Sequence, residues 1–339
     1  MSAVRLGVIG AGWFASRRHC PDVVEHPKAQ LTAFCRRDAD QLRQMAEKFE
    51  VKHSFTDYRD LLESGTVDGV IICSPHHLHY EHTRAALEKG LDVLLEKPIT
   101  IDPAQGYELV RLAAALERSL IVAQNPPYWS HCRFLRQQLQ NGPLGELEAA
   151  HIHWVGNAKG LLGLEELPAN MPGVVPPTLF RQNREENGGG LLVDGGSHLI
   201  CELIWCSGLR VRRVTAQMDN AEWDVRAVLT LELENGALAT LSNLGDSAIC
   251  EKRQHSLYYC STGTATVRGF PGRIMLETDG QTRNIHEQEL PPPPSPVGNL
   301  VDCMLGHGEP EISGETAVHV VEVLSAAYES AQSGKRVTI

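Results

Sequence analysis

Features that mark several other protein classes are missing from this chain of 339 residues. No apolar run is long enough to cross a bilayer. The N-terminus shows no secretory signal pattern, because the apolar residues 6–9 end at once in glycines. There is no basic excess either, since 31 Lys and Arg against 42 Asp and Glu give a formal net charge of −11. These absences argue against membrane and nucleic-acid partners and predict a cytoplasmic protein.

The nine cysteines form no CxxC pair, and several of them, such as Cys73 and Cys201, fall inside apolar runs. Cysteines of this kind are typical of a reduced core rather than of disulfides or metal ligands. The histidines at positions 76, 77 and 79 have no acidic or cysteine partner at ligand spacing, so we expect no metal ion. With 42% hydrophobic and 22% charged residues, a chain of this length suits two globular domains.

A glycine-rich turn near the N-terminus lies between a predicted strand and a predicted helix. The apolar residues 6–9 precede Gly10, Gly12 and Ala15 in a Gly-x-Gly-x-x-Ala motif, and a helix is expected to follow up to about Glu25. Gly10 permits the tight turn, Gly12 lets the backbone approach a pyrophosphate, and Ala15 lets helix and strand pack closely. The pyrophosphate would lie at the positive end of the helix dipole. The motif predicts dinucleotide binding, and a tight turn without a ligand is the alternative.

Two arginines follow the second predicted strand. In a dinucleotide-binding fold this position contacts the adenosine ribose, and an acidic residue there binds the 2′-hydroxyl and favours NAD. Arg36 and Arg37 instead offer permanently charged, bidentate donors for a 2′-phosphate. The pattern therefore favours NADP(H), with NAD(H) still possible. The alternative is that both arginines are solvated and that Asp38 merely caps a helix over residues 39–49.

Strands alternate with helices through residue 124. This alternation predicts a Rossmann domain over residues 1–124, with a doubly wound parallel sheet and right-handed crossovers. Ligands bind at the carboxyl ends of such strands, where we expect the turns at residues 74–79 and 96–98. The predicted cofactor-binding residues are Gly10, Gly12, Trp13, Phe14, Arg36, Arg37, Ser74, Pro75, His76, His79, Glu96, Lys97 and Gln124.

Lys97 closes a predicted buried strand and is followed by Pro98. A lysine in this place is unusual for a solvated side chain. We interpret it as an ammonium directed at a substrate hydroxyl or carbonyl oxygen beside the nicotinamide. The alternative is an ordinary surface pair between Glu96 and Lys97.

The pattern changes after residue 124, where strands are separated by turn signals such as Asn235-Gly236 and Asp279-Gly280. Residues 125–339 are therefore predicted to form a C-terminal α+β domain with a large, mostly antiparallel open sheet, which binds substrate and mediates oligomerisation. Residues 156–187 form a long proline-containing loop, which we interpret as a lid or a subunit-contact arm. A passive surface excursion is the alternative.

The glycine motif at residues 10–15, the turn from Ser74-Pro75 to His79 and the sequence Glu96-Lys97-Pro98 occur together in a known family. With them the chain resembles the glucose-fructose oxidoreductase / inositol dehydrogenase (Gfo/Idh/MocA) family. The resemblance continues through the glycine-rich Asp…His segment at residues 188–198 and the last helix at residues 313–330, and so covers nearly the whole chain. It implies a Rossmann domain followed by an α/β domain on a large open sheet.

The resemblance also implies a triad of Lys97, Asp194 and His198, with the nicotinamide held between the two domains. A subunit contact of sheet face on sheet face, giving a homodimer or homotetramer, would be similar to the family. From the residues alone, Asp194 and His198 would share one face if the segment is helical, and a surface hydrogen bond is the alternative. The chain departs from the family at His76, often Asn, and at Cys201, often Asp. It departs again at residues 124–129, where the family commonly has a simple aromatic segment. These differences affect the expected substrate more than the chemistry.

The function hypothesis is hydride transfer between NADP(H) and a secondary alcohol or ketone of a sugar, cyclitol or derivative. His198 would carry the proton, because its reference pKa of about 6.5 suits both directions. Lys97 would bind the same oxygen and could share the proton role, Asp194 would orient a hydroxyl or hold His198, and Tyr128 would line the pocket.

Two alternative functions remain at this point. The first is an NAD-dependent glycosidase that acts by transient oxidation, and the arginines after the second strand count against it. The second is a nucleotide-sensing or partner-binding protein, and the retained Lys, Asp and His of the triad count against it.

Overall fold

The computed structural model describes residues 3–269 and 272–339. By packing, the chain divides into two compact units. Unit 1 comprises Met1–Ala123, Glu166–Asn187 and Pro294–Val318, and unit 2 comprises Gln124–Glu165, Gly188–Pro293 and His319–Ile339. Two later segments, Glu166–Asn187 and Pro294–Val318, therefore pack with the N-terminal part of the chain. The division into domains over residues 1–124 and 125–339 stays a prediction.

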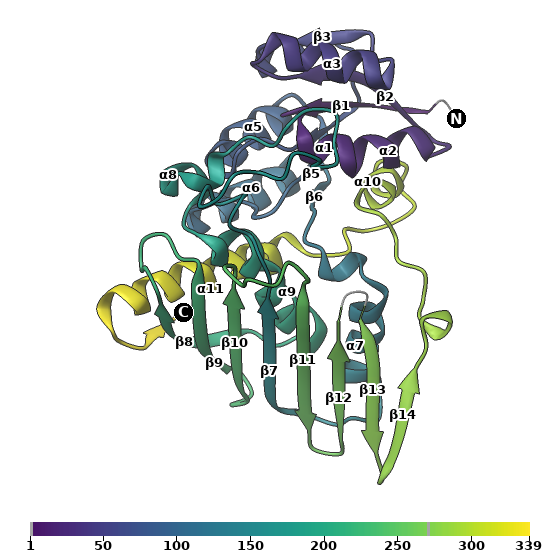
Figure 1. Cartoon of the computed structure of the whole chain (residues 1–339). Helices are drawn as coiled ribbons and strands as arrows, with labels where there is room; N and C mark the ends of the chain where they lie inside the picture. Colours follow the sequence, from purple (N-terminus) through teal and green to yellow (C-terminus); the bar gives the residue numbers. More distant parts are fainter. Residues whose placement is uncertain (1–2, 270–271) are drawn as a thin grey trace. The chain divides into compact units, whose positions relative to one another are not determined.

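Unit 1 is built on a six-stranded parallel sheet with the strand order β3-β2-β1-β4-β5-β6 (Figure 1). The strands are β1 (Val4–Ile9), β2 (Ala29–Cys35), β3 (His53–Phe55), β4 (Gly69–Ile72), β5 (Asp92–Leu95) and β6 (Leu120–Val122). The helices of this part are α1 (Trp13–Arg17), α2 (His19–Glu25), α3 (Ala39–Phe49), α4 (Tyr58–Glu63), α5 (His79–Glu88) and α6 (Pro103–Ala115), joined by α8 (Arg184–Asn187) and α10 (Pro296–Met304). The predicted doubly wound parallel sheet is confirmed.

The central strands of this sheet are apolar because both of their faces are covered. All four residues of β4 are buried, and the last three residues of β5 and of β6 are buried as well. The strand order reverses between β1 and β4, which is the switch point where ligands bind in doubly wound sheets. The sheet therefore presents the ends of β1, β4 and β5 as the place for a site.

The first helix is shorter than predicted. It was expected to run to about Glu25, but α1 ends at Arg17 and a separate helix α2 starts at His19. Pro21 explains the break, because it has no N–H to donate to the carbonyl of Arg17 and its ring would clash with that carbonyl. The chain bends at Arg18, with φ −122° and ψ −70°.

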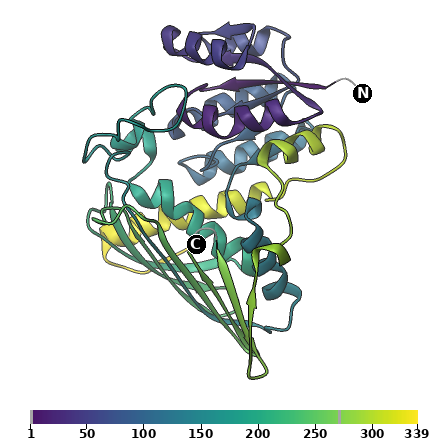
Figure 2. The same cartoon turned by 45° about the vertical axis from the view of Figure 1, so that its right-hand side comes forward.

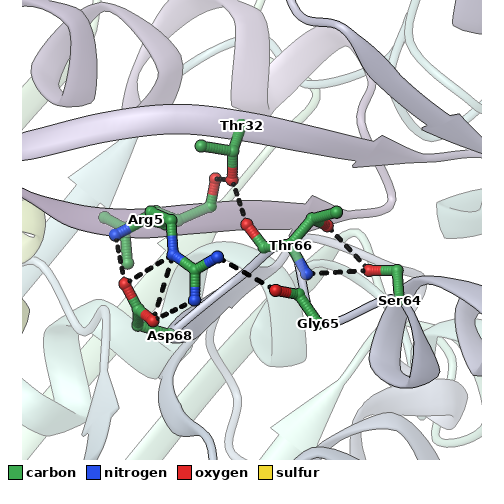
Figure 3. A network of polar contacts seen from close by, with 7 residues as sticks. Arg5, Thr32, Ser64, Gly65, Thr66 and Asp68 are labelled. Atoms are coloured by element: carbon green, nitrogen blue, oxygen red, sulfur yellow. Dashed lines mark hydrogen bonds and ion pairs between the residues drawn. The ribbon is translucent and has the colours of Figure 1, made fainter.

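A polar network ties the other, amino-terminal end of this sheet together (Figure 3). The Arg5 guanidinium pairs with Asp68 at 2.6 Å and donates to the carbonyl of Gly65 at 2.9 Å. The Thr32 hydroxyl donates to the carbonyl of Thr66 at 3.0 Å. The network therefore joins β1 and β2 to the turn before β4.

Unit 2 is built on a nine-stranded sheet with the order β14-β13-β12-β11-β7-β10-β9-β8-β15. Within this sheet, only the β7–β10 pair is parallel among the strand pairs that the structure describes. The predicted large, mostly antiparallel sheet is therefore confirmed. Its strands are β7 (Leu147–Val155), β8 (Val211–Met218), β9 (Arg226–Leu233), β10 (Leu238–Leu244), β11 (Arg253–Cys260), β12 (Gly263–Arg268), β13 (Arg273–Thr278), β14 (Gln281–Ile285) and β15 (Val337–Thr338).

The helices of unit 2 lie along one face of its sheet, as Figure 2 shows. They are α7 (Ser130–Asn141), α9 (Ser197–Ser207) and most of α11 (Gly314–Ser333), which starts in the last segment of unit 1. Burial alternates along β9, β10 and β11, as expected for strands with one covered face. On the other face Val228, Leu238 and Tyr259 are 51%, 56% and 43% exposed.

No helix among residues 3–269 and 272–339 is long and apolar enough to cross a membrane. In the same described part of the chain, no group of three or more His, Cys, Asp or Glu side chains is arranged to hold a metal ion.

Candidate active site

The glycine turn after β1 is packed closely against the end of β4. Gly10 has a φ of +81°, and a Cβ at this position would lie 2.6 Å from the backbone of Cys73 and Ser74. The N–H groups of Gly10 and Ala11 donate to the carbonyl of Cys35 at the end of β2. The turn is therefore fixed against both neighbouring strands, and helix α1 begins directly after it without a side-chain cap. This is the shape that a pyrophosphate needs.

Arg36 lies across this turn. Its Nη1 donates to the carbonyl of Ala11 at 3.3 Å, and a Cβ on Gly12 would lie 2.6 Å from the same nitrogen. Its Nη2 bonds the side chain of Gln41. Asp38 caps α3 by accepting from the Gln41 N–H at 2.9 Å. The capping role proposed for Asp38 is confirmed, but Arg36 is half-buried beside the glycine turn rather than solvated.

Arg37 differs from Arg36 because its side chain is exposed. Burial lowers the pKa of Arg36 somewhat, but an arginine starts from so high a value that it keeps its charge. The structure therefore offers one fixed guanidinium and one solvated guanidinium at the end of β2.

His79 joins the turns after β4 and β5. Its ring nitrogens lie 2.7 Å from the carbonyl oxygen of Pro98 and 2.9 Å from that of Ser74. The ring is fully buried, and burial lowers its pKa. His82, one turn further along α5, lies 3.0 Å from the Ser74 hydroxyl, and burial lowers its pKa to about 4. Both turns are thus anchored by buried imidazoles on one helix.

Lys97 lies in the second of these turns and is 8% exposed. The carboxylate of Glu96 accepts from the Lys97 backbone N–H at 3.3 Å and lies 2.7 Å from Nε2 of His19 on α2. The Lys97–Pro98 peptide bond is cis. The burial of Lys97 excludes the solvated surface pair, and it leaves an ammonium held at the carboxyl end of β5.

The segment Glu166–Asn187 packs against the turns after β1 and β4. His76 contacts the ring of Phe180, with 4.9 Å between ring centroids, and its Nδ1 lies 2.9 Å from the carbonyl of Asn187. The Val174 N–H donates to the Ser16 hydroxyl at 3.1 Å. These contacts favour the lid interpretation of the long loop over a passive excursion, and the lid stays a prediction.

In unit 2, Asp194 and His198 are half-buried members of one otherwise buried helical segment. Asp194 lies in a π-helical turn, Leu192–Gly196, and His198 lies in the first turn of α9. Within residues 191–200 only Asp194, Gly195 and His198 are not fully buried. The segment is helical at both positions, and π turns in helices frequently occur at functional sites.

His198 has aromatic and amide neighbours that sequence reasoning missed. Nδ2 of Asn125 lies 3.2 Å from Nε2 of His198, so the amide donates to that nitrogen. The ring of Trp129 lies 6.1 Å from the imidazole and stacks on His131 at 5.4 Å. In the sequence, the departure from the family at residues 124–129 was the only indication that this segment matters for the site. Tyr128, in the short helix Pro126–Tyr128 of the same segment, is buried.

Gln124 is fully buried, and neither its amide nitrogen nor its amide oxygen has a hydrogen-bond partner within residues 3–269 and 272–339. A buried polar group without a partner costs about 1–3 kcal/mol, so such groups normally meet a ligand or water. The Trp13 Nε1 at the start of α1 is in the same situation. In unit 1, the Trp13 Nε1 and the glycine turn fit a polar dinucleotide.

A parallel sheet of this strand order, with a glycine turn at its switch point, is the architecture that binds nicotinamide dinucleotides. The chain belongs to the Gfo/Idh/MocA family. Residues 4–124 match the family described as "Oxidoreductase family, NAD-binding Rossmann fold", and residues 132–266 match the GFO/IDH/MocA C-terminal domain. The expected family and enzyme class are confirmed: the protein is an NAD(P)-dependent oxidoreductase.

Two curated relatives and one solved structure are similar to this chain. D-glucoside 3-dehydrogenase of Escherichia coli (strain K12) is 27% identical, over 100% of this chain and 98% of the relative. A dTDP-3,4-didehydro-2,6-dideoxy-alpha-D-glucose 3-reductase of Streptomyces violaceoruber is 35% identical, over 64% of this chain and 59% of the relative. An oxidoreductase domain protein from Kribbella flavida has the same fold, with a TM-score of 0.87 at 21% identity over 100% of both chains.

Proposed function

We propose that the protein transfers a hydride between NADP(H) and a secondary alcohol or ketone of a pyranose sugar, with the C3 position of a D-glucoside as the first candidate. The observation that carries the chemistry is the Lys97 ammonium, which is 8% exposed at the carboxyl end of β5. The substrate class is supported by the two curated relatives, both of which are named for reactions at C3 of glucose derivatives.

The bound nicotinamide would supply or accept the hydride, and the protein must handle one proton. We assign this proton to His198, whose Nε2 lies beside the Asn125 amide. Lys97 would donate a hydrogen bond to the same substrate oxygen and stabilise its developing negative charge. Asp194, half-buried in the same segment as His198, would accept a hydrogen bond from a neighbouring sugar hydroxyl, and Tyr128 would line the pocket.

Several residues, most of them in unit 1, would hold the dinucleotide. The turn at Gly10 and Gly12 would receive the pyrophosphate. Arg36, held beside that turn, would bind the 2′-phosphate and so favour NADP(H). The buried amide of Gln124 would bond a polar group of the cofactor.

The open face of the unit 2 sheet would be covered by a second copy of the chain. Val228, Leu238 and Tyr259 are large apolar side chains that stay exposed on this face. A second copy packed on this face would remove these side chains from water, which supports a homodimer or homotetramer formed through the sheet.

The test is a screen for nicotinamide absorbance change. Purified protein is mixed with NADP⁺ or NAD⁺ and a panel of D-glucosides, and with NADPH and a panel of 3-keto-glucosides, other keto-sugars and inososes. Net oxidation or reduction of the cofactor with a glucoside or its 3-keto form supports the proposal. Cleavage of a glycoside without net cofactor change would replace it with the glycosidase reaction. Activity with inososes alone would move the substrate to cyclitols.

A further inference from the structure

The backbone just before Asp194 is held by two side chains that come from distant parts of unit 2. The buried carboxylate of Asp224, which precedes β9, accepts the N–H of Leu192 at 2.9 Å. The hydroxyl of Tyr328 on α11 donates to the other oxygen of this carboxylate and accepts the N–H of Gly190 at 2.9 Å. The carbonyl of Asp224 accepts the N–H of Leu191 at 2.8 Å. Three successive N–H groups are therefore bonded by this Asp–Tyr pair.

These N–H groups stand where a helix normally needs a cap. The first N–H groups of a helix have no carbonyl partner within it, and a Ser, Thr, Asp or Asn just before the helix usually satisfies one of them. Here three glycines, residues 188–190, precede the helical residues that begin at Leu191 and supply no such side chain. The Asp–Tyr pair replaces the local cap with one that is anchored to β9 and α11.

The fit leaves no room for a side chain on the glycines. A Cβ on Gly190 would lie 2.0 Å from the carbonyl oxygen of Asp224, and a Cβ on Gly189 would lie 2.4 Å from the Tyr328 hydroxyl. Gly189 also has a φ of +147°. The backbone therefore lies directly against the Asp–Tyr pair, and its position depends on them.

The contacts continue from the Asp–Tyr pair to the site. Gly190, whose N–H bonds Tyr328, uses its carbonyl to accept the N–H of Asp194 at 3.4 Å. The next carbonyl, of Leu191, accepts from the Asn243 side-chain amide at 3.2 Å. Because the Gly190 carbonyl accepts from Asp194, the residue that Tyr328 holds is also the start of the helical hydrogen bonds that position Asp194.

Burial raises the pKa of Asp224 above its ordinary value, and the hydrogen bonds from Tyr328 and Leu192 oppose this rise in part. Burial and the neighbouring carboxylate raise the pKa of Tyr328 well above its usual value, so its hydroxyl remains a donor. The negative charge of the nearby Asp219 also raises the pKa of Asp224, because it disfavours a second carboxylate beside it.

We propose that Asp224 and Tyr328 are positioning residues, which hold Gly190–Leu192 so that Asp194 and His198 face the substrate. This role rests on the proposed function of Asp194 and His198. Neither residue is assigned contact with substrate or cofactor, and both act through the backbone of the π turn.

The test compares Tyr328→Phe with Ser330→Ala. Tyr328→Phe keeps the ring and removes only the hydroxyl. Ser330, two residues further along α11, is a fully buried hydroxyl that donates to the Lys335 carbonyl and accepts the Ala216 N–H, away from the glycines. It is the matched control for losing a buried hydroxyl from this helix.

We expect Tyr328→Phe to lower kcat for the sugar at least tenfold and to move the pH profile of kcat, with the KM for the cofactor unchanged within about twofold. Ser330→Ala should lower Tm by a comparable amount and leave kcat and its pH profile in place. If Tyr328→Phe keeps the wild-type kcat and pH profile and only lowers Tm, the pair has a structural role alone and the proposal is wrong. Asp224→Asn, which keeps the shape of the side chain, repeats the test if the Phe variant does not fold.

A readout that needs no turnover separates this proposal from the proposed function. Amide hydrogen exchange at Gly190 and Leu192 and the pKa of His198 from histidine NMR are measured in the wild type and in Tyr328→Phe. Loss of protection and a moved His198 pKa support the positioning role even if no sugar is oxidised. Unchanged exchange and an unchanged His198 pKa contradict it whatever the activity screen finds.

Discussion

The two ends of the parallel sheet in unit 1 carry polar side chains of very different kinds. At the amino end, the Arg5–Asp68 pair is about 40% exposed on both sides. At the carboxyl end, His79 and Lys97 are buried. Exposed ion pairs contribute about 0–1 kcal/mol, whereas a buried polar group is costly unless it is bonded. The comparison indicates that the amino end adds modest stability, while the carboxyl end holds buried polar groups that hydrogen bonds or a ligand must satisfy.

Removing the buried lysine should produce the largest effect. We expect Lys97→Ala to reduce turnover at least about a hundredfold, the usual scale for losing acid–base or electrostatic help, and to leave NADPH binding nearly intact. Steady-state kinetics and a fluorescence titration with NADPH measure the two quantities. Lys89→Ala, at an exposed lysine of unit 1, is the control and should keep full activity. Full turnover in Lys97→Ala would remove this residue from the mechanism.

Acid should weaken the carboxyl end through His82. The pKa of His82 in the folded protein is about 4, below the ordinary value of 6.5. The imidazole therefore binds a proton less tightly in the folded protein than in the unfolded chain. Stability is complete above about pH 6.5 and falls as the pH drops from 6.5 toward 4. One pKa unit corresponds to about 1.4 kcal/mol, so lowering the pKa by about 2.5 corresponds to about 3–4 kcal/mol in full.

His82→Gln tests this loss, with His77→Gln as the control because His77 is exposed. Urea unfolding at pH 7.5 and 4.5 should show a smaller acid loss in His82→Gln than in the wild type, and an unchanged loss in His77→Gln. An equal acid loss in all three proteins would contradict the prediction. His131 in unit 2, whose pKa burial also lowers to about 4, and His79, whose pKa burial lowers, contribute to the residual loss.

The two arginines after β2 offer a matched pair. Arg36→Ala should reduce the preference for NADP(H) over NAD(H) by about tenfold or more, because a fixed guanidinium beside the glycine turn is lost. Arg37→Ala should change the preference by less than about threefold, because its side chain is exposed and its charge is screened. The ratio of kcat/KM for the two cofactors measures both. An unchanged ratio in Arg36→Ala would show that the 2′-phosphate assignment is wrong.

The smallest effect is expected at the amino end of the sheet. Arg5→Ala should lower the free energy of unfolding by less than about 1 kcal/mol and leave turnover unchanged. Arg5 lowers the pKa of Asp68 below its ordinary value, so the pair contributes at neutral pH and its contribution is lost as the pH falls through that lowered pKa. Urea unfolding at neutral pH in low and high salt measures this loss of unfolding free energy, and the loss should be smaller in high salt. A large loss, or a loss of activity, would contradict the contrast between the two ends.

Much of this architecture could be predicted because it follows from local pattern. Apolar runs such as β4 and the glycine turn at Gly10 report directly on buried strands and a tight turn. The helix break at Arg18 was missed, although Pro21 gave a usable signal. The sequence also did not predict that residues 166–187 and 294–318 pack with the N-terminal part of the chain. The pattern of residues 1–124 does not specify which later segments pack beside that part.

The site was predictable only in part. The carboxyl ends of β4 and β5 follow from the sheet rule, which identified the turns of Ser74 and Lys97. The Asp224–Tyr328 pair could not be found this way, because 104 residues separate its members and each looks ordinary in sequence. Asn125 beside His198 was equally hidden, since the two lie 73 positions apart in the sequence and only the fold brings them together.

The central proposal is that Lys97 and His198 act on one substrate oxygen, and a double-mutant cycle on kcat/KM tests it most directly. Lys97→Ala, His198→Ala and the double variant are compared, with Lys97→Ala combined with Arg5→Ala as the pair expected to be additive. Residues that act as a unit are strongly non-additive, so the Lys97/His198 double variant should be little slower than the slower single variant. Losses that multiply in full would show that the two side chains serve different steps and would contradict the account.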